Sequence, residues 1–324
     1  MRIIPTSNSR ALERVITRNA VRDPKVVAGA ARIVADVRRR GDAALRTWMR
    51  RLDGVDPPFA LSRADLRAGW QATPREVRRA IRAAAARIRR VAALQVPRPF
   101  RVSTATGVRI EQRAQPIASA GCYVPGGRHP LPSTVLMTVI PARVAGVPEV
   151  TVACPNPTPA VLCAAVEAGA TRVVRLGGAQ AIAALAYGTP SVRRVEKIVG
   201  PGNAWVAAAK RIVAPDCPID FDAGPSEVVV WSDAGRPEWI AADLIAQAEH
   251  DPDARAILVT TSDALARQVR VAVNRRMPDD GPARRPSAPT ARSSSRATAP
   301  RRARSPIASR PSIWSATAPT TRRT

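Results

Sequence analysis

The sequence predicts an α/β fold in which parallel βαβ units follow a mainly helical N-terminal region and precede a disordered tail. Three observations predict it. Helix patterns dominate up to residue 109, short β-branched runs alternate with helical stretches over residues 110–276, and residues 277–324 lack apolar periodicity. We therefore expect three regions with these boundaries in a chain of 324 residues, a length that suits about two domains, and we expect residues 1–109 to contribute to the first α/β domain.

Two helices are predicted in residues 1–109. The first begins at Asp23-Pro24 and ends at Gly41, because aspartate favours the N-cap, proline is tolerated in the first turn, and Val26–Val37 carries apolar side chains at helical spacing. The second begins at Thr73–Glu76, which has the spacing of a capping box, and continues as an Ala/Arg-rich run through Val91. We interpret its arginines as a solvated face.

From about Ile110 the pattern changes to strands that alternate with helices. The predicted strands are Val150–Ala153, Arg172–Leu176, Glu227–Trp231 and Ala256–Thr260. The predicted helices are Pro159–Ala168, Ala179–Tyr187, Pro237–Glu249 and Ser262–Val273. Because strands separated by helices pair in parallel, residues 110–276 are predicted to form a Rossmann-like α/β region.

Three glycine-rich segments follow predicted strands or begin predicted helices. They are Gly121–Gly127, Gly177–Gln180 and Gly200–Asn203. Glycine lets the backbone approach a ligand closely, and the free N–H groups at a helix start attract phosphate. None of the segments has the G-x-G-x-x-G spacing, and each alone is also explained as an ordinary turn. Together, at the carboxyl ends of strands where open sheets bind ligands, they favour a dinucleotide site.

The formal charge of +26 would ordinarily favour nucleic-acid binding. Two observations weaken that interpretation. Lysine occurs only at Lys25, Lys197 and Lys210, so the basic residues are almost all arginine, as GC-rich coding favours. Aromatic residues make up 3% of the chain, so stacking platforms for single strands are largely missing. Nucleic acid is therefore not the expected partner.

The cysteines, the apolar runs and the first residues bear on location. The four cysteines form no C-x-x-C pair, so they predict reduced thiols rather than a disulfide framework or a zinc ribbon. No apolar run approaches the roughly 18 residues of a membrane span, and Met1–Arg10 lacks the apolar core of a secretory signal. We expect a cytoplasmic protein without membrane contact.

Gln247 and His250 lie three residues apart at the end of the predicted helix Pro237–Glu249, and side chains at this spacing share a face. An amide oxygen and an imidazole nitrogen directed at one point make half of a zinc site, since catalytic zinc usually takes about three protein ligands. The competing interpretation is a histidine that stabilises the helix C-terminus and an ordinary polar glutamine. Glu249 points elsewhere on the helix and is not predicted to act as a base.

Five linked motifs resemble those of the histidinol dehydrogenase family in order and spacing. They are Gly121–Gly127 with Pro132–Met137, Gly177–Ala186, Val199–Asn203, Ala223–Glu227 and Gln247–His250. The resemblance covers nearly all of the chain up to about Arg276. It implies a homodimeric enzyme that contains zinc and oxidises L-histidinol to L-histidine in two NAD-dependent steps, the last reactions of histidine biosynthesis.

The resemblance also implies roles for six residues, carried over motif by motif. The residues that match NAD contacts are Tyr123, Gln180 and Asn203. The residues that match substrate contacts are Ser226, Gln247 and His250. Gln247 and His250 also match two of the family's zinc ligands, so NAD and zinc are the expected cofactors.

The departure from the family begins near Met277. No glutamate and no histidine follows His250, so the family's Glu-His acid/base pair and its final His zinc ligand have no counterpart, and no catalytic residue is assigned. Aspartates do follow His250, but the family's Asp zinc ligand cannot be placed among them. Arg, Pro, Ala, Ser and Thr fill residues 277–324, as GC-rich codons yield when they are translated out of register. We expect a frameshifted, disordered tail and little activity, because losing a general base costs typically 10²–10⁴-fold in rate.

Two alternatives stay open. One is a catalytically empty nucleotide-binding module whose basic tail binds nucleic acid or another acidic partner. The other is a paralogous dehydrogenase of a different small alcohol. In the family's dimers the two subunits exchange their carboxyl ends. Since this chain departs from the family at that end, the homodimer is a doubtful expectation for it.

Overall fold

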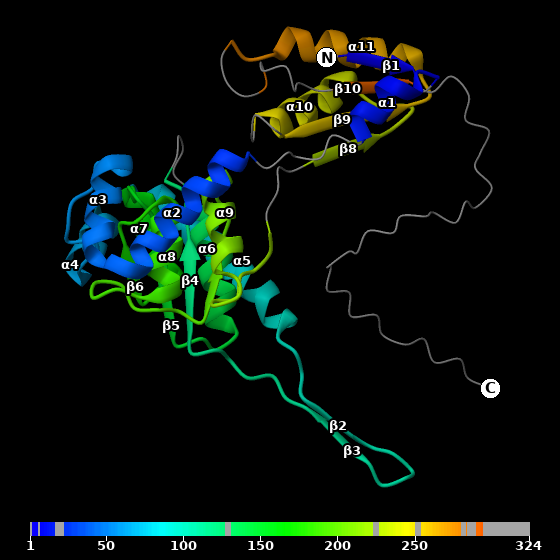
Figure 1. The fold of residues 1–324 in the computed structure, drawn as a ribbon. Coiled ribbons are helices and arrows are strands. Elements are labelled where there is room, and N and C mark those ends of the chain that lie inside the picture. Colours follow the sequence, from blue (N-terminus) through cyan, green and yellow to red (C-terminus); the bar gives the residue numbers. More distant parts are fainter. Residues whose placement is uncertain are drawn as a thin grey trace. The chain divides into compact units, whose positions relative to one another are not determined.

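The computed structural model describes residues 2–5, 7–16, 23–126, 131–222, 227–249, 254–279, 283 and 290–293. The chain divides into a central unit, residues 19–224, and a terminal unit that combines residues 1–18 with residues 225–324 (Figure 1). Helices that precede residue 110 pack on strands that follow it, and both ends of the described chain contribute strands to one sheet.

The central unit is built on a four-stranded parallel sheet with the strand order β6-β5-β4-β7. Its strands are β4 (Ser119–Tyr123), β5 (Glu149–Ala153), β6 (Arg172–Val174) and β7 (Lys197–Val199). Cys122 of β4 lies opposite Val152 on one side and Val199 on the other. The predicted strands at residues 150–153 and 172–176 are confirmed, whereas β4 and β7 had no predicted counterpart.

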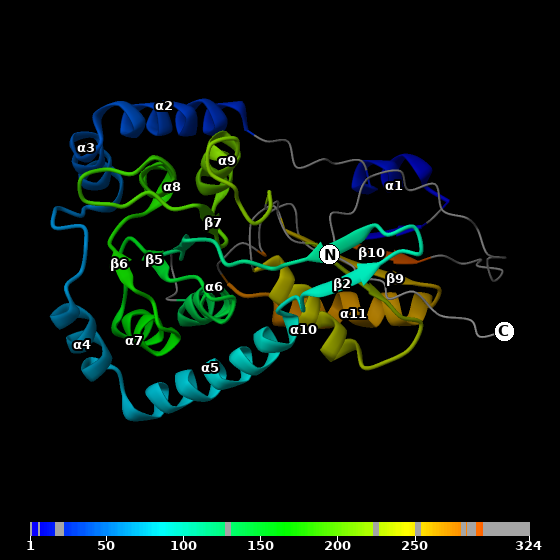
Figure 2. The ribbon, with the colours of Figure 1, turned by 90° about the horizontal axis from the view of Figure 1, so that it is seen from below.

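Helices cover both faces of this sheet, as Figure 2 shows. The helices on the first face are α2 (Pro24–Arg40), α3 (Asp42–Asp53), α8 (Gly178–Tyr187) and α9 (Ala204–Val213). The helices on the second face are α4 (Arg63–Ala72), α5 (Arg75–Gln95), α6 (Pro132–Val144) and α7 (Pro159–Ala168). Each face has its own buried core, so the sheet is the middle of three layers.

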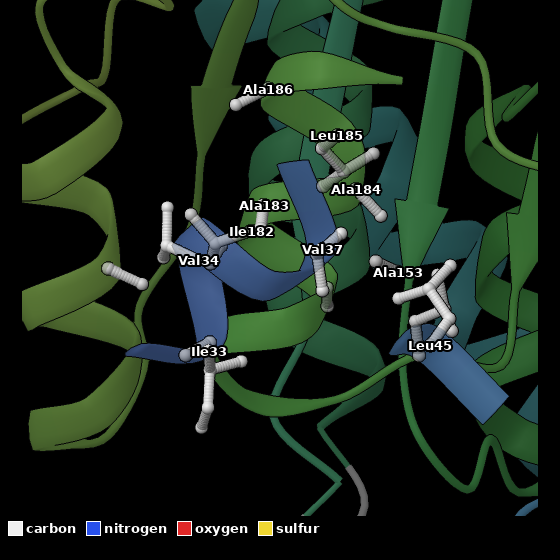
Figure 3. Packing of buried hydrophobic residues seen from close by; sticks show 14 of the residues in the cluster. Ile33, Val34, Val37, Leu45, Ala153, Ile182, Ala183, Ala184, Leu185 and Ala186 are labelled. Carbon is white, nitrogen blue, oxygen red and sulfur yellow. The ribbon is translucent and has the colours of Figure 1, made fainter. Parts of the chain in front are cut away.

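The core of the first face joins α2 to α8 (Figure 3). Ile33, Val34 and Val37 of α2 are at most 3% exposed, which confirms the apolar stripe predicted for this helix. Ile182 and Leu185 of α8 are fully buried in the same cluster. Burying an aliphatic side chain of this size stabilises a fold by about 1.5–3 kcal/mol, so these contacts hold α8 against α2.

The N-cap predicted for α2 is confirmed, whereas the capping box predicted for α5 is not. Asp23 caps α2 as predicted, because its side chain accepts a hydrogen bond from a backbone N–H in the first turn (2.9 Å). The start of α5 has no side-chain cap; Thr73 Oγ1 instead donates to the carbonyl of Gly69 (2.9 Å). The capping box predicted at Thr73 is therefore wrong. A reciprocal capping box occurs one helix earlier, between Ser62 and Asp65.

A two-stranded antiparallel hairpin joins α5 to the sheet. Its strands are β2 (Phe100–Ser103) and β3 (Arg109–Gln112), and every residue in both strands is exposed. Val102 lies opposite Ile110 in the ladder. The hairpin had no predicted counterpart, and its side chains contribute nothing to the buried cores of the central unit.

The terminal unit contains a second four-stranded parallel sheet with the strand order β1-β10-β9-β8. Its strands are β1 (Arg2–Pro5), β8 (Glu227–Trp231), β9 (Arg255–Thr260) and β10 (Thr290–Ser293), and its helices are α1 (Ser9–Ile16), α10 (Pro237–Ala248) and α11 (Asp263–Arg276). Leu244, Leu258 and Val269 are fully buried in its core. The strands and helices predicted over residues 227–273 are confirmed.

Strand β10 changes the interpretation of the predicted tail. Thr290–Ser293 pairs with β1 on one side and with β9 on the other, so the expectation of disorder is wrong for these four residues. Strand pairing uses only backbone groups, which explains why a segment without apolar periodicity can join a sheet. Most other residues of the segment 277–324 lie outside the described part of the chain.

All four cysteines are free and buried, as predicted for reduced core thiols. Burial raises the pKa of the Cys122 thiol to about 12 and that of the Cys154 thiol to about 11, so neither is a reactive thiolate at neutral pH. Within the described ranges, no helix is both long and apolar enough to cross a lipid bilayer.

Candidate functional site

The carboxyl edge of the central sheet carries the segments that the sequence singled out. Strand β4 ends at Tyr123, the loop Gly200–Asn203 follows β7, and α8 begins at Gly178 after β6. Strands β4 and β7 are neighbours, but the helices that follow them, α6 and α9, lie on opposite faces of the sheet. Open α/β sheets bind ligands at the position where successive connections diverge in this way.

Tyr123 links the end of β4 to the start of α8. Its hydroxyl accepts a hydrogen bond from the backbone N–H of Gly178 (3.1 Å), and its side chain is buried among the first-face core residues. Burial raises the pKa of the Tyr123 hydroxyl to about 12. The hydroxyl is therefore protonated at neutral pH and can still donate its own hydrogen to an acceptor.

Gln180 occupies the first turn of α8 and is 1% exposed. Its Nε2 donates to Asp53 Oδ2 (2.9 Å) and to the sulfur of Met49 (3.5 Å), both on α3. Its Oε1 is buried and has no hydrogen-bond partner within the part of the chain that the structure describes. Nearly all buried polar atoms in folded proteins are paired, so this oxygen marks a place where a partner is missing.

Asp53 is a site residue that sequence reasoning missed. It is the last residue of α3, and 127 positions separate it from Gln180. Burial raises the pKa of the Asp53 carboxyl, although the hydrogen bond from Gln180 acts in the opposite direction. An aspartate before a glycine at a helix end is an ordinary pattern, so the sequence holds no signal that would have found this contact.

The backbone of Gly200 is held on both sides. Its φ angle is +114°, and a Cβ at this position would lie 2.2 Å from the carbonyl oxygen of Tyr123, so only glycine fits. Its N–H donates to Asp220 Oδ2 (2.8 Å), and its carbonyl accepts from Lys210 Nζ (3.0 Å). Lys210 and Asp220 also pair with each other, with side chains 3% and 19% exposed. This buried ion pair fixes the loop after β7.

Asn203 ends that loop and caps α9. Its Oδ1 accepts from the backbone N–H groups of Trp205 and Val206, both at 3.1 Å, and the residue is exposed. These two hydrogen bonds fix the orientation of the Asn203 side-chain amide at the end of the loop. The structure thus places the three predicted NAD contacts on one edge of one sheet: Tyr123 and Gln180 are buried there and Asn203 is exposed.

The predicted substrate and zinc residues belong to the terminal unit. Gln247 lies half-buried in the last turn of α10, whereas Ser226 and His250 lie outside the described residues. Glu249 Oε1 accepts from the backbone N–H of Ala283 (3.1 Å), which gives it a structural contact. Within the described ranges, no three His, Cys, Asp or Glu side chains gather as metal ligands, so these residues alone do not form a zinc site.

Comparison with known proteins gives consistent matches. The family model described as histidinol dehydrogenase matches residues 16–298, beyond the limit at Arg276 that the sequence motifs indicated. The histidinol dehydrogenase of Cereibacter sphaeroides is 51% identical over 262 residues, which cover 78% of this chain and 60% of that protein. The one from Methanothermobacter thermautotrophicus is 44% identical over 273 residues, which cover 82% of this chain and 64% of that protein.

The fold comparison agrees with the sequence comparison. A crystal structure of histidinol dehydrogenase from Elizabethkingia anophelis superposes with a TM-score of 0.83 at 31% sequence identity. The match covers 90% of this chain and 70% of that structure. Against its relatives in sequence, the chain spans about 60% of their length.

Proposed function

Because the chain belongs to the histidinol dehydrogenase family, a family of oxidoreductases, we propose that its central unit binds NAD for the oxidation of L-histidinol to L-histidine. The family resemblance implies two successive oxidations. Each removes a hydride from the substrate carbon and a proton from an oxygen, and water adds to the aldehyde between them. A bound NAD+ would accept the hydride in each step, so two molecules of NAD+ would be reduced for each substrate oxidised.

The observation that carries this proposal is the strand order of the central sheet. If β4 is counted as the first strand, the order β6-β5-β4-β7 becomes 3-2-1-4, which matches the first four positions of the doubly wound order 3-2-1-4-5-6. Dinucleotides bind such sheets where the order reverses, here between β4 and β7. Tyr123 is the last residue of β4, and the loop Gly200–Asn203 follows β7 directly.

The side chains at this edge fit a dinucleotide. Gln180 Oε1 is a buried acceptor without a partner among the described residues, and the Tyr123 hydroxyl keeps a hydrogen that it can donate. Glycine at position 200 lets the loop after β7 pass directly beside the Tyr123 carbonyl, so this loop and the end of β4 lie together at the edge. Tyr123, Gln180 and Asn203 would hold and orient the cofactor, as the resemblance implies.

The substrate half of the proposal rests on the resemblance. Ser226, Gln247 and His250 would bind the imidazole and the amino alcohol, and Gln247 and His250 would be two of the zinc ligands. The described residues do not themselves assemble a zinc site, so no step of the reaction is assigned to the metal. For these 324 residues we propose NAD binding with little turnover, because no glutamate or histidine follows His250 to act as the family's acid/base pair.

Calorimetric titration of the whole chain with NAD tests the proposal. The parent chain is expected to bind, and Gly200→Ala to bind at least about tenfold more weakly, because the new Cβ would collide with the Tyr123 carbonyl. Gly107→Ala is the matched control, since Gly107 also has a positive φ but no atom within 4 Å of an added Cβ. If the parent chain does not bind NAD, the proposed function is rejected.

A second measurement tests the expectation of low activity. L-histidinol and NAD are mixed with the chain, and the absorbance of the reduced nicotinamide is followed. Turnover at the rate of a full-length relative measured in parallel would contradict the proposal that this chain lacks its general base. Binding without turnover supports it.

A further inference from the structure

The amide of Gln180 is held in one orientation by α3. A carboxylate has acceptors only, so the group facing Asp53 Oδ2 at 2.9 Å must be the Nε2 donor and not the amide oxygen. The sulfur of Met49, a weak acceptor, takes the second Nε2 contact at 3.5 Å. Both contacts direct the nitrogen toward α3 and leave Oε1 on the other side.

The free side of the amide faces the start of α8. A Cβ built at Gly178 would lie 2.7 Å from Gln180 Oε1, so the glycine at this position leaves the oxygen room that any other residue would fill. Oε1 is buried and has no partner in the described part of the chain. A carbonyl oxygen accepts hydrogen bonds and cannot donate one, so what it lacks is a donor.

We propose that Asp53 is a positioning residue for the dinucleotide site: it holds Gln180 so that Oε1 accepts a hydrogen bond from an N–H or O–H group of NAD. This inference rests on the proposed function and deepens it. A phosphate oxygen is an acceptor, so the part of the ligand at Gln180 is a ribose hydroxyl or the nicotinamide carboxamide and not the pyrophosphate. Because Oε1 is buried, a donor group of NAD reaches it only when the protein groups that cover it move.

The experiment measures NAD binding by calorimetry in the parent chain and four variants. The variants are Asp53→Asn, Asp53→Leu, Gln180→Leu and the double variant Asp53→Leu/Gln180→Leu. Asp53→Leu is expected to weaken binding by about tenfold, because the amide loses its fixed orientation. Asp53→Asn keeps an acceptor oxygen and is expected to recover most of that affinity. The double variant should bind no more weakly than Gln180→Leu, because Asp53 acts through Gln180.

The matched control is Asp56→Asn, three residues along the chain. The Asp56 side chain is 58% exposed and pairs with Arg50 at the surface, so this variant should bind NAD like the parent. Circular dichroism checks that each variant is folded, and Asp53→Asn keeps the test informative if Asp53→Leu does not fold. The side-chain amide resonance of Gln180 gives a readout independent of ligand, and it should shift in the Asp53 variants but not in Asp56→Asn.

The outcomes separate this inference from the proposed function. If the parent binds NAD and Asp53→Leu binds it equally well, Asp53 has no positioning role although the proposed function stands. If the losses from Asp53→Leu and Gln180→Leu add in the double variant, Asp53 acts independently of Gln180 and the inference is again overturned. If the parent does not bind NAD, both are rejected.

Discussion

The two parallel sheets of this chain have the same number of strands, but helices cover their faces to different extents. In the central sheet, Cys122 and Tyr123 point to opposite faces and are both buried, because helices lie on each side. In the terminal sheet, Val229 and Trp231 on one side of β8 are 59% and 79% exposed, whereas Val230 between them packs on the core. Parallel sheets are usually covered on both faces. The central unit therefore has a closed core, and the described part of the terminal unit leaves one side of β8 open.

The same contrast applies to function. The candidate NAD contacts lie within the closed central unit, and each side chain there is fixed by a hydrogen bond from its surroundings, such as that between Gln180 and Asp53. Of the candidate substrate residues, only Gln247 is described, in the terminal unit. We expect the closed core of the central unit to make cofactor binding less sensitive to substitution than substrate binding.

The largest effect is expected in the central unit at the buried ion pair. Lys210→Met leaves the Asp220 carboxylate, which is only 19% exposed, without its cation and should lower the free energy of unfolding by about 3–5 kcal/mol. Urea unfolding followed by circular dichroism measures it. Lys197→Met, at the other lysine of this region, removes the same charge from a half-buried position and is the control. Equal losses in the two variants would contradict the role assigned to the pair.

A smaller but still large effect is expected in the core of the terminal unit. Leu258 on β9 is fully buried, so Leu258→Ala should lower the free energy of unfolding by about 2–5 kcal/mol through lost burial and a cavity. Val229→Ala on the adjacent strand is the control and should change it by less than about 0.5 kcal/mol, since Val229 is mostly exposed. A large loss at Val229 would show that the open side of β8 is covered in solution.

The Asp36 side chain on α2 links this helix to α3, since it accepts a hydrogen bond from Trp48. Asp36 accepts hydrogen bonds from Arg40 and from the indole of Trp48, and the bonds from Arg40 chiefly lower the pKa of its carboxyl from 3.8 to about 2. Asp36→Asn should cost roughly 1–2 kcal/mol of unfolding free energy at pH 7.

The pH dependence of that variant has a defined sign. Because the pKa of Asp36 is lower in the folded chain than in the unfolded chain, its contribution is fully present above about pH 4 and is lost as the pH falls toward 2. The difference between parent and Asp36→Asn should shrink over this range in urea unfolding. Asp56→Asn, at an exposed pair, should show little difference at either pH. A constant difference at Asp36 would contradict the ion-pair explanation.

The smallest effect is expected at the open side of β8. Trp231 is 79% exposed, so Trp231→Ser should change the free energy of unfolding by less than about 0.5 kcal/mol. Gel filtration of the same variant compares its apparent size with that of the parent, and a change in size would show that Trp231 contacts another molecule. Trp48→Ser, at a nearly buried tryptophan, is the contrasting variant and should be strongly destabilising.

The parts of the fold that could be predicted have strong local patterns. Helix α2 was predicted from an N-cap, a spaced apolar stripe and a final glycine, and strand β5 from a run of β-branched residues between helices. Strand β4 escaped prediction because Ser119–Tyr123 contains no β-branched residue, and β7 because three residues are too few for a period. The capping box at Thr73 failed because that side chain bonds backward to Gly69.

The sequence by itself determined the family, the alternation of strands and helices, and the residue types that follow the strands, because motif spacing and periodicity are local properties of the chain. Only the tertiary structure decided which side chains meet. Asp53 contacts Gln180, and Lys210 contacts both Asp220 and the Gly200 carbonyl. These contacts depend on how α3, α8 and α9 pack over the sheet. Packing depends on the shapes of whole surfaces, and no spacing in a linear sequence encodes it.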